Sequence, residues 1–163
     1  MGKSYYVKER FFSIGAKFDV FNEFGKEEFL VEADKFDIGK NISIYDTNRI
    51  KKLLYMKQQL RLGAHKYRAY DSNNTEIATI QKEFMIPKYN ITGIMGTIKM
   101  ESKGILGRNY LVTKNDNLIG KIDKQLTFGR DKYTLEVIDE DYLILLIGLL
   151  VMVDMVKFHN DNN

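Results

Sequence analysis

The stretch that decides the fold runs from Asp139 to Asp154 and reads DEDYLILLIGLLVMVD. Its acidic residues come first, where the unbonded N–H groups and the dipole of a helix N-terminus attract negative charge. The run that follows has no polar face, so the helix must be enclosed by lipid or by protein. A membrane-spanning helix needs roughly 20 apolar residues, and this run is interrupted by Asp154 well before that length. The segment from Tyr142 to Val156 is therefore expected to be a helix buried inside the protein and not a membrane anchor.

The composition around this helix is that of one globular domain. The chain has 163 residues, of which 44% are hydrophobic and 29% charged, and we expect a single domain over residues 1–163. The absence of cysteine excludes disulfides and thiolate metal sites. The N-terminus shows no apolar run behind a basic start, so no signal peptide is expected and the cytoplasm is the expected compartment.

A repeated hairpin unit organises the rest of the chain. Residues 57–67 read KQQLRLGAHKY and residues 123–133 read DKQLTFGRDKY, and shorter copies occur at residues 12–18 and 84–89. Each copy has alternating apolar residues, then a glycine or proline, then a lysine followed by an aromatic residue. Alternation places the apolar side chains on one face of a strand, and the breaker turns the chain. The pattern predicts a hairpin unit used about four times.

Further turns rich in Asn, Asp and Gly separate additional strand-like runs. The turns are expected at Asn22–Gly25, Asp71–Asn74 and Asn115–Asn117. The runs between them are Phe29–Val31, Ile42–Ile44, Ile77–Ile80 and Tyr110–Val112. Many short strands at this spacing predict either a barrel or a sandwich.

Several stretches taken together resemble the LURP-one-related family, a part of the tubby-like superfamily that also holds the phospholipid scramblases. These are Leu54–Leu62, Lys66–Asp71, Glu76–Lys82, Ile119–Lys124 and the terminal helix with its Val153-Asp154 ending. The resemblance covers nearly the whole chain, from about Tyr6 to Lys157. It implies a mainly β fold, with a closed barrel of about twelve strands around a buried C-terminal hydrophobic helix.

The resemblance also implies where a ligand could bind. A barrel plugged by its own helix has no lumen for a ligand, so binding must use the outer wall or the loops. In the superfamily, tubby domains bind phosphoinositides and scramblases act on membrane lipids with calcium. The residues Asp139, Glu140 and Asp141 lie where scramblases have an acidic stretch, but helix capping explains them. The membrane-anchoring tail and cysteines of scramblases have no counterpart, which argues against lipid scrambling.

A basic stretch supplies the candidate binding site. No acidic residue occurs from Thr47 to Tyr70, while basic residues are frequent there. Strand parity points Lys57 and Arg61 outward, beside Lys66 and Arg68 on the next strand. Such a cluster could hold phosphate headgroups or an acidic protein. The alternative is an ordinary solvated strand face.

The sequence gives no support for catalysis, a metal site or a cofactor. His65 and His159 are the only histidines, and no nucleophile elbow, phosphate loop or zinc-protease pattern occurs. Residues 71–76 look like the first half of a calcium loop. Lys82 stands where such a loop has its bidentate glutamate, so a hairpin turn is expected. Asp154 is expected at the barrel mouth, bonded to a lysine, an arginine or a backbone N–H.

Two functions fit these observations. The first is a non-catalytic module that binds anionic lipid headgroups or phosphate through its outer basic surface, placing it at the membrane periphery. The second is a protein-interaction or scaffold domain without a small ligand. Nucleic acid is less favoured, because the aromatic residues fall where core positions are expected.

Overall fold

The computed structural model describes residues 2–10, 15–34, 41–61, 64–83, 86–104, 108–127 and 130–160. The strands are β1 (Lys3–Glu9), β2 (Ala16–Phe21), β3 (Glu27–Ala33), β4 (Ile42–Asp46), β5 (Lys52–Arg61), β6 (Ala64–Asp71), β7 (Glu76–Lys82), β8 (Lys88–Gly93), β9 (Gly96–Ser102), β10 (Asn109–Lys114), β11 (Asn117–Thr127) and β12 (Arg130–Val137). A 3₁₀ turn, η1 (Glu140–Tyr142), leads into the helix α1 (Leu143–Asn160).

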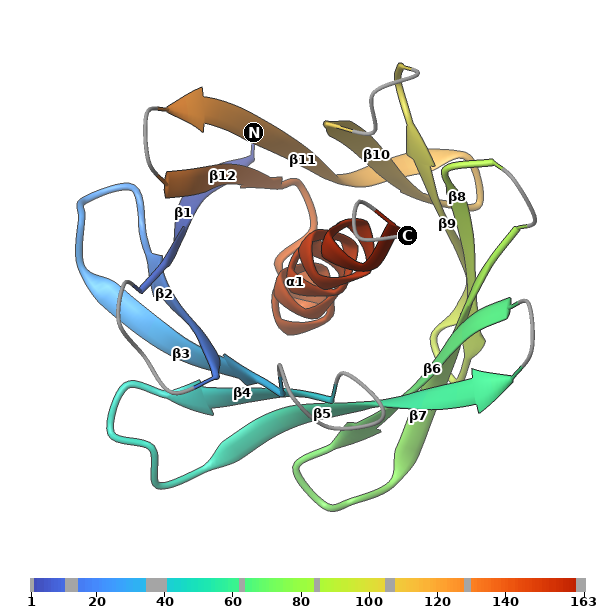
Figure 1. Ribbon diagram of the computed structural model, residues 1–163, viewed down its shortest axis with the longest axis horizontal. Coiled ribbons are helices and arrows are strands. Elements are labelled where there is room, and N and C mark those ends of the chain that lie inside the picture. The colour runs from blue at the N-terminus through green and yellow to red at the C-terminus, as the bar shows by residue number, and fades with distance from the viewer. Residues whose placement is uncertain are drawn as a thin grey trace.

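The strands form one closed antiparallel barrel in which each strand pairs with its neighbours in sequence (Figure 1). The barrel closes where β1 pairs with β12, with Lys3 opposite Val137 and Lys8 opposite Lys132. Apolar residues alternate along the strands, as in β4 where Ile42 and Ile44 face the interior and are fully buried. The expected mainly β fold, a closed barrel of twelve strands with a C-terminal helix, is confirmed.

The helix α1 lies inside the barrel and supplies the middle of the core (Figure 1). The residues of α1 with no exposed surface are Leu146, Ile147, Leu149, Leu150, Val151 and Met152. None of the helices within the described residues, α1 included, has the length and apolarity that a membrane crossing requires. The expected burial of this segment is therefore confirmed, because strands surround a helix that is apolar on every face.

Glycines let the wall approach the helix closely. A Cβ at Gly120 on β11 would lie 2.8 Å from Cδ1 of Leu146. A Cβ at Gly148, on the helix itself, would lie 2.6 Å from the Met56 sulfur on β5. Real Cβ contacts are longer than this, so a methyl group added at either glycine would require the end of the Leu146 or Met56 side chain to move.

The acidic residues before the helix act as the expected cap. The carboxylate of Asp139 accepts a hydrogen bond from the Asp141 backbone N–H at 3.1 Å. Lys3 forms an ion pair with Glu140 at 2.7 Å. On the far side of the same turn, Lys114 Nζ lies 2.6 Å from the Tyr142 hydroxyl. These contacts fix the point at which the chain leaves the wall and enters the interior.

The antiparallel order gives the barrel two different ends. The turns that follow β2, β4, β6, β8 and β10 lie at the end where α1 begins, which we name the N-rim. The connections that follow the odd-numbered strands lie at the opposite end, the C-rim. The turns expected at Asn22–Gly25, Asp71–Asn74 and Asn115–Asn117 are confirmed, and all of them belong to the N-rim.

The repeated unit is confirmed as a hairpin at its two clearest copies. Arg61 pairs with Ala64 at the end of β5–β6, and Thr127 pairs with Arg130 at the equivalent place in β11–β12. The intervening turns, residues 62–63 and 128–129, lie outside the described residues. The breakers of the shorter copies, Gly15 and Pro87, are described, and Gly15 has a positive φ of 78°. The aromatic residue that ends each copy points inward and is buried: these are Phe18, Tyr67, Tyr89 and Tyr133.

Asp154 has a hydrogen-bond partner that the sequence did not suggest. It lies near the C-terminal end of α1, where the Tyr133 hydroxyl from β12 donates to its carboxylate. The expectation named a lysine, an arginine or a backbone N–H. Tyr133 is twenty-one positions away in the chain. It lies on the strand that precedes the helix, so the contact forms where α1 folds back along β12.

The contact between Gly120 and Leu146 can be tested by a double-mutant cycle. Gly120→Ala overpacks the core and should destabilise the protein by about 1–3 kcal/mol. Leu146→Ala leaves a cavity and should cost about 2–5 kcal/mol. The double variant should lose less than the sum, because the added methyl occupies part of the vacated space. Free energies of unfolding from denaturant titration measure this, and strictly additive losses would show that these residues do not touch.

A second prediction concerns high pH. Burial raises the pKa of Tyr67, Tyr89 and Tyr110 above the ordinary phenol value of 10.0. Above about pH 10 the unfolded chain loses phenol protons that the folded barrel retains, so stability is complete below that pH and falls as pH rises. Unfolding free energies measured across this range, alongside tyrosinate absorbance, should show ionisation of these phenols only as the barrel opens. Ionisation near pH 10 in the folded state would contradict it.

Candidate functional site

The register of β5 and β6 brings the sequence-predicted basic residues onto one outer face. Lys57 pairs directly with Arg68, and Gln59 pairs with Lys66. The interleaving residues, such as Met56 and Tyr67, are buried, so the basic side chains lie on the outer wall. We name Lys57, Arg61, Lys66 and Arg68 the basic wall. The backbone of Arg61 has the same parity in β5, but its side chain lies outside what the structure describes.

Uncharged residues flank the basic wall. On the next strand, β7, Thr79 pairs with Arg68 and Gln81 pairs with Lys66. Within the described residues no ion pair is formed by Lys57 or Lys66. The Lys57–Arg68 pair therefore places two positive charges directly opposite each other, an arrangement that destabilises a sheet.

Arg68 has one nearby carboxylate at a long distance. Its Nε atom lies 3.7 Å from Oε1 of Glu76, near the N-rim end of β7. That distance is too long for a hydrogen bond. Nε is covered from solvent, and no described group accepts a hydrogen bond from it; the Gln59 side-chain oxygen nearby is in the same situation. The basic wall thus contains a positioned donor that its own neighbours leave unused.

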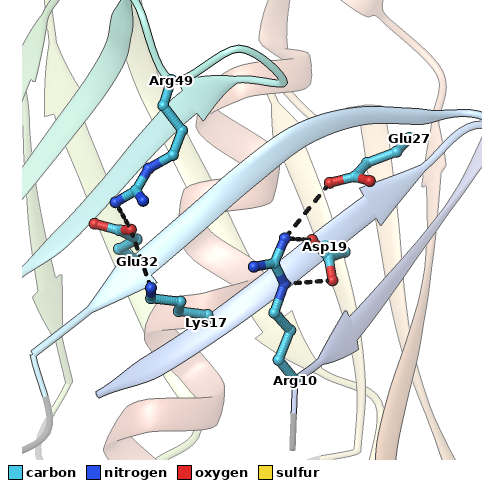
Figure 2. Close-up of polar contacts among 6 residues, drawn as sticks. All are labelled: Arg10, Lys17, Asp19, Glu27, Glu32 and Arg49. Atoms are coloured by element: carbon cyan, nitrogen blue, oxygen red, sulfur yellow. Dashed lines mark hydrogen bonds and ion pairs between the residues drawn. The ribbon is translucent and has the colours of Figure 1, made fainter. Parts of the chain in front are cut away.

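The outer wall of β2 and β3 shows the opposite arrangement (Figure 2). There Lys17 faces Glu32 across the strands, with Nζ 3.8 Å from the carboxylate, and Arg49 pairs with the same glutamate. A second group joins Arg10 to Asp19 at 2.7 Å and to Glu27 at 3.8 Å. On this part of the wall every cation shown has a carboxylate partner.

The pKa shifts on β2 and β3 follow from these pairs. The hydrogen bond to Asp19 raises the pKa of Arg10. Burial pushes the pKa of Asp19 upward, but the hydrogen bonds with Arg10 and Glu27 outweigh it and leave the pKa below its ordinary value. Burial and the neighbouring Asp19 raise the pKa of Glu27. Arg10, Lys17 and Arg49 each have a carboxylate partner within this group.

Aromatic residues on the outer wall were not foreseen from the sequence. Tyr55 and Tyr70 pair across β5 and β6, with ring centroids 6.2 Å apart. The Lys52 ammonium lies 5.0 Å from the Tyr55 ring and 5.7 Å from the Tyr45 ring. These tyrosines are half-buried and alternate with inward residues, so the expectation that aromatics occupy core positions holds for Tyr67 but not for them. They extend the basic wall toward the N-rim.

Other candidate positions carry a structural role. The Asp71 carboxylate accepts hydrogen bonds from the backbone N–H groups of Asn73 and Thr75, each at 2.9 Å. The residues that resembled a calcium loop are thus the hairpin turn expected for them. His65 and His159 have side chains outside the described set. In the described part of the chain, no three histidine, aspartate or glutamate side chains group so as to share a metal ion.

Comparison with known proteins agrees with this architecture. A family model described as LURP-one-related matches residues 3–154, which span every strand and most of α1. The chain is also similar to a protein of Bacillus subtilis (strain 168) named Uncharacterized protein YxjI. The two are 23% identical over 159 residues, which cover 96% of this chain and 95% of the relative. The chain therefore belongs to the LURP-one-related family.

Proposed function

We propose that this protein is a non-catalytic binding module that holds the phosphate groups of anionic phospholipids on its basic wall, at the membrane periphery on the cytoplasmic side. The observation that carries the proposal is the direct pairing of Lys57 with Arg68, without a carboxylate between them. The same wall supplies Lys66 one pair further along.

The chemistry of the basic wall suits a phosphate. Arginine presents a planar fork of donors that matches phosphate oxygens, and lysine adds a mobile point charge. The Arg68 side chain is 38% exposed, so its guanidinium can meet a phosphate from solvent. The interior offers no competing site, because α1 fills it with apolar side chains. The outer wall is where a ligand can reach the protein.

The Lys57–Arg68 pair also fits a binding role, because like charges opposite each other lower the stability of the folded barrel. A like-charged pair directly across two strands costs roughly 0.2–1 kcal/mol compared with a neutral pair. The wall of β2 and β3 shows that this barrel can place a carboxylate opposite a lysine, as with Glu32 and Lys17. Glu76 lies 3.7 Å from Arg68 and partly compensates its charge, but Lys57 has no carboxylate partner among the described residues. An external anion would complete the pair.

The first test is binding to vesicles. Sedimentation with phosphatidylcholine vesicles that contain phosphatidylglycerol should recover the protein, while pure phosphatidylcholine vesicles should not. Replacing both Lys57 and Lys66 by Gln should weaken partition roughly tenfold or more, since each cation near an anionic surface contributes about 1 kcal/mol. Binding should fall as salt is raised.

The matched control is Lys17→Gln. It removes one half-buried lysine from β2, outside the basic wall, and Glu32 already neutralises that lysine, so binding should change little. Inorganic phosphate added as a competitor separates free phosphate from a headgroup: displacement at low concentration would indicate a soluble ligand. Equal recovery on charged and neutral vesicles would refute the proposal, and so would recovery on neither.

The second test uses stability. Lys57→Glu turns the like-charged pair with Arg68 into an opposite-charged pair, so the free energy of unfolding should rise by a few tenths of a kcal/mol. Vesicle binding by the same variant should be lost. Thermal unfolding and sedimentation on one preparation measure both effects. If stability and binding fall together, the substitution has damaged the wall and Lys57 has no specific role in binding.

A further inference from the structure

The strand that carries Lys57 leads directly to an exposed apolar side chain on the N-rim. Ile50 lies in the turn between β4 and β5 and is 84% exposed. The turn is held firmly, because the Asp46 carboxylate accepts hydrogen bonds from the backbone N–H groups of Ile50 at 3.0 Å and Lys51 at 3.4 Å. Ile50 is thus presented to solvent by an ordered turn.

From this turn into β5, the outward side chains change from apolar to basic and aromatic. Ile50 comes first, then the exposed Lys51 and Lys52. Tyr55 follows, with its ring under the Lys52 ammonium at 5.0 Å, and then Lys57 of the basic wall. An apolar tip, then tyrosine rings among lysines, is the order in which side chains settle from the acyl boundary to the headgroups of a bilayer.

We propose that the β4–β5 hairpin is a membrane-docking edge, in which Ile50 enters the headgroup–acyl boundary of an anionic bilayer. Tyr45, Tyr55 and Lys52 then lie at headgroup level, and the basic wall meets lipid phosphates. This inference rests on the proposed function and adds how the protein is oriented: the side of the barrel formed by β4, β5 and β6 faces the membrane.

A bilayer fits this edge better than a protein partner. Stable protein interfaces bury about 800 Å² on each side around a contiguous apolar centre. Here Ile50 is a single apolar tip, with Arg49 before it and Lys51 after it. A fluid lipid surface accepts one protruding side chain without a complementary pocket, and its phosphates complement the lysines.

A second N-rim turn provides a matched comparison. Phe24, between β2 and β3, is 87% exposed, and Asn22 orders its turn by accepting hydrogen bonds from the backbone N–H groups of Phe24 and Lys26. Its charged neighbours in sequence are Glu23, Lys26, Glu27 and Glu28, so acidic residues outnumber basic ones there, whereas Arg49 and Lys51 flank Ile50. Phe24 is about as exposed as Ile50 and has a less basic surrounding.

The chain contains no tryptophan, so a single introduced tryptophan reports its own environment. Ile50→Trp and Phe24→Trp would be bound separately to phosphatidylcholine–phosphatidylglycerol vesicles with and without brominated acyl chains. The fluorescence of Ile50→Trp should shift to the blue and be quenched by the brominated chains. The fluorescence of Phe24→Trp should remain that of an indole in water. Ile50→Ser should weaken partition by roughly tenfold while leaving thermal unfolding unchanged.

The other possible outcomes separate a failure of the docking edge from a failure of the proposed function. If the vesicles recover Ile50→Trp but bromine does not quench it, the docking edge is wrong and the proposed function stands. Equal quenching of both tryptophans would overturn the orientation in which the side formed by β4, β5 and β6 faces the membrane, because the β2–β3 turn would then enter the bilayer as well. If the vesicles recover neither the parent chain nor Ile50→Trp, the proposed function fails and the docking edge fails with it.

Discussion

Contact between the apolar faces of α1 and the inner surface of the barrel is the interaction on which the structure depends. The helix has no polar face to offer water, and the twelve-stranded wall has a wide interior that must be filled. The strands therefore cover the apolar surface of the helix, and the helix fills the interior of the barrel. Close approach at Gly120 and Gly148 leaves little room between them, so the centre of the barrel is a core and not a binding cavity. Any recognition by this protein has to use side chains on the outside.

Two regions of the outer wall differ in whether their cations have carboxylate partners. On β2 and β3, Glu32 and Asp19 neutralise the cations around them, and this region behaves as an ordinary protein surface. On β5 and β6, Lys57 and Arg68 oppose each other, with Thr79 and Gln81 beside them on β7 and one carboxylate, Glu76, at 3.7 Å from Arg68. Both regions are built from the same hairpin arrangement, so the difference comes from side-chain choice and not from the backbone. That contrast within one barrel supports a role in binding more strongly than the net charge of the chain does.

The fold was largely predictable, because its main signals are local. An apolar run of limited length indicated the enclosed helix, and the repeated glycine, lysine and aromatic residue indicated the hairpins. The outward tyrosines were missed although parity could have found them, because Tyr55 lies two positions before Lys57 and Tyr70 two positions after Arg68. Aromatic residues were assigned to the core by their apolarity instead. The hydrogen bond between Tyr133 and Asp154 depends on how α1 folds back along β12, which no local pattern shows. For the basic wall, parity predicted that Lys57 and Arg68 share a face, but only the register shows that they are directly paired.

The position of α1 after all the strands in the chain has a consequence for how the molecule is made. During synthesis the wall emerges from the ribosome before the segment that fills it, and β1 has no partner on one side until β12 appears. The incomplete sheet then carries an unpaired edge and an apolar inner surface open to water, both of which favour association between chains. Productive folding has to wait for the last helix, so truncation or stalling near the C-terminus should be far more damaging than its share of the sequence suggests.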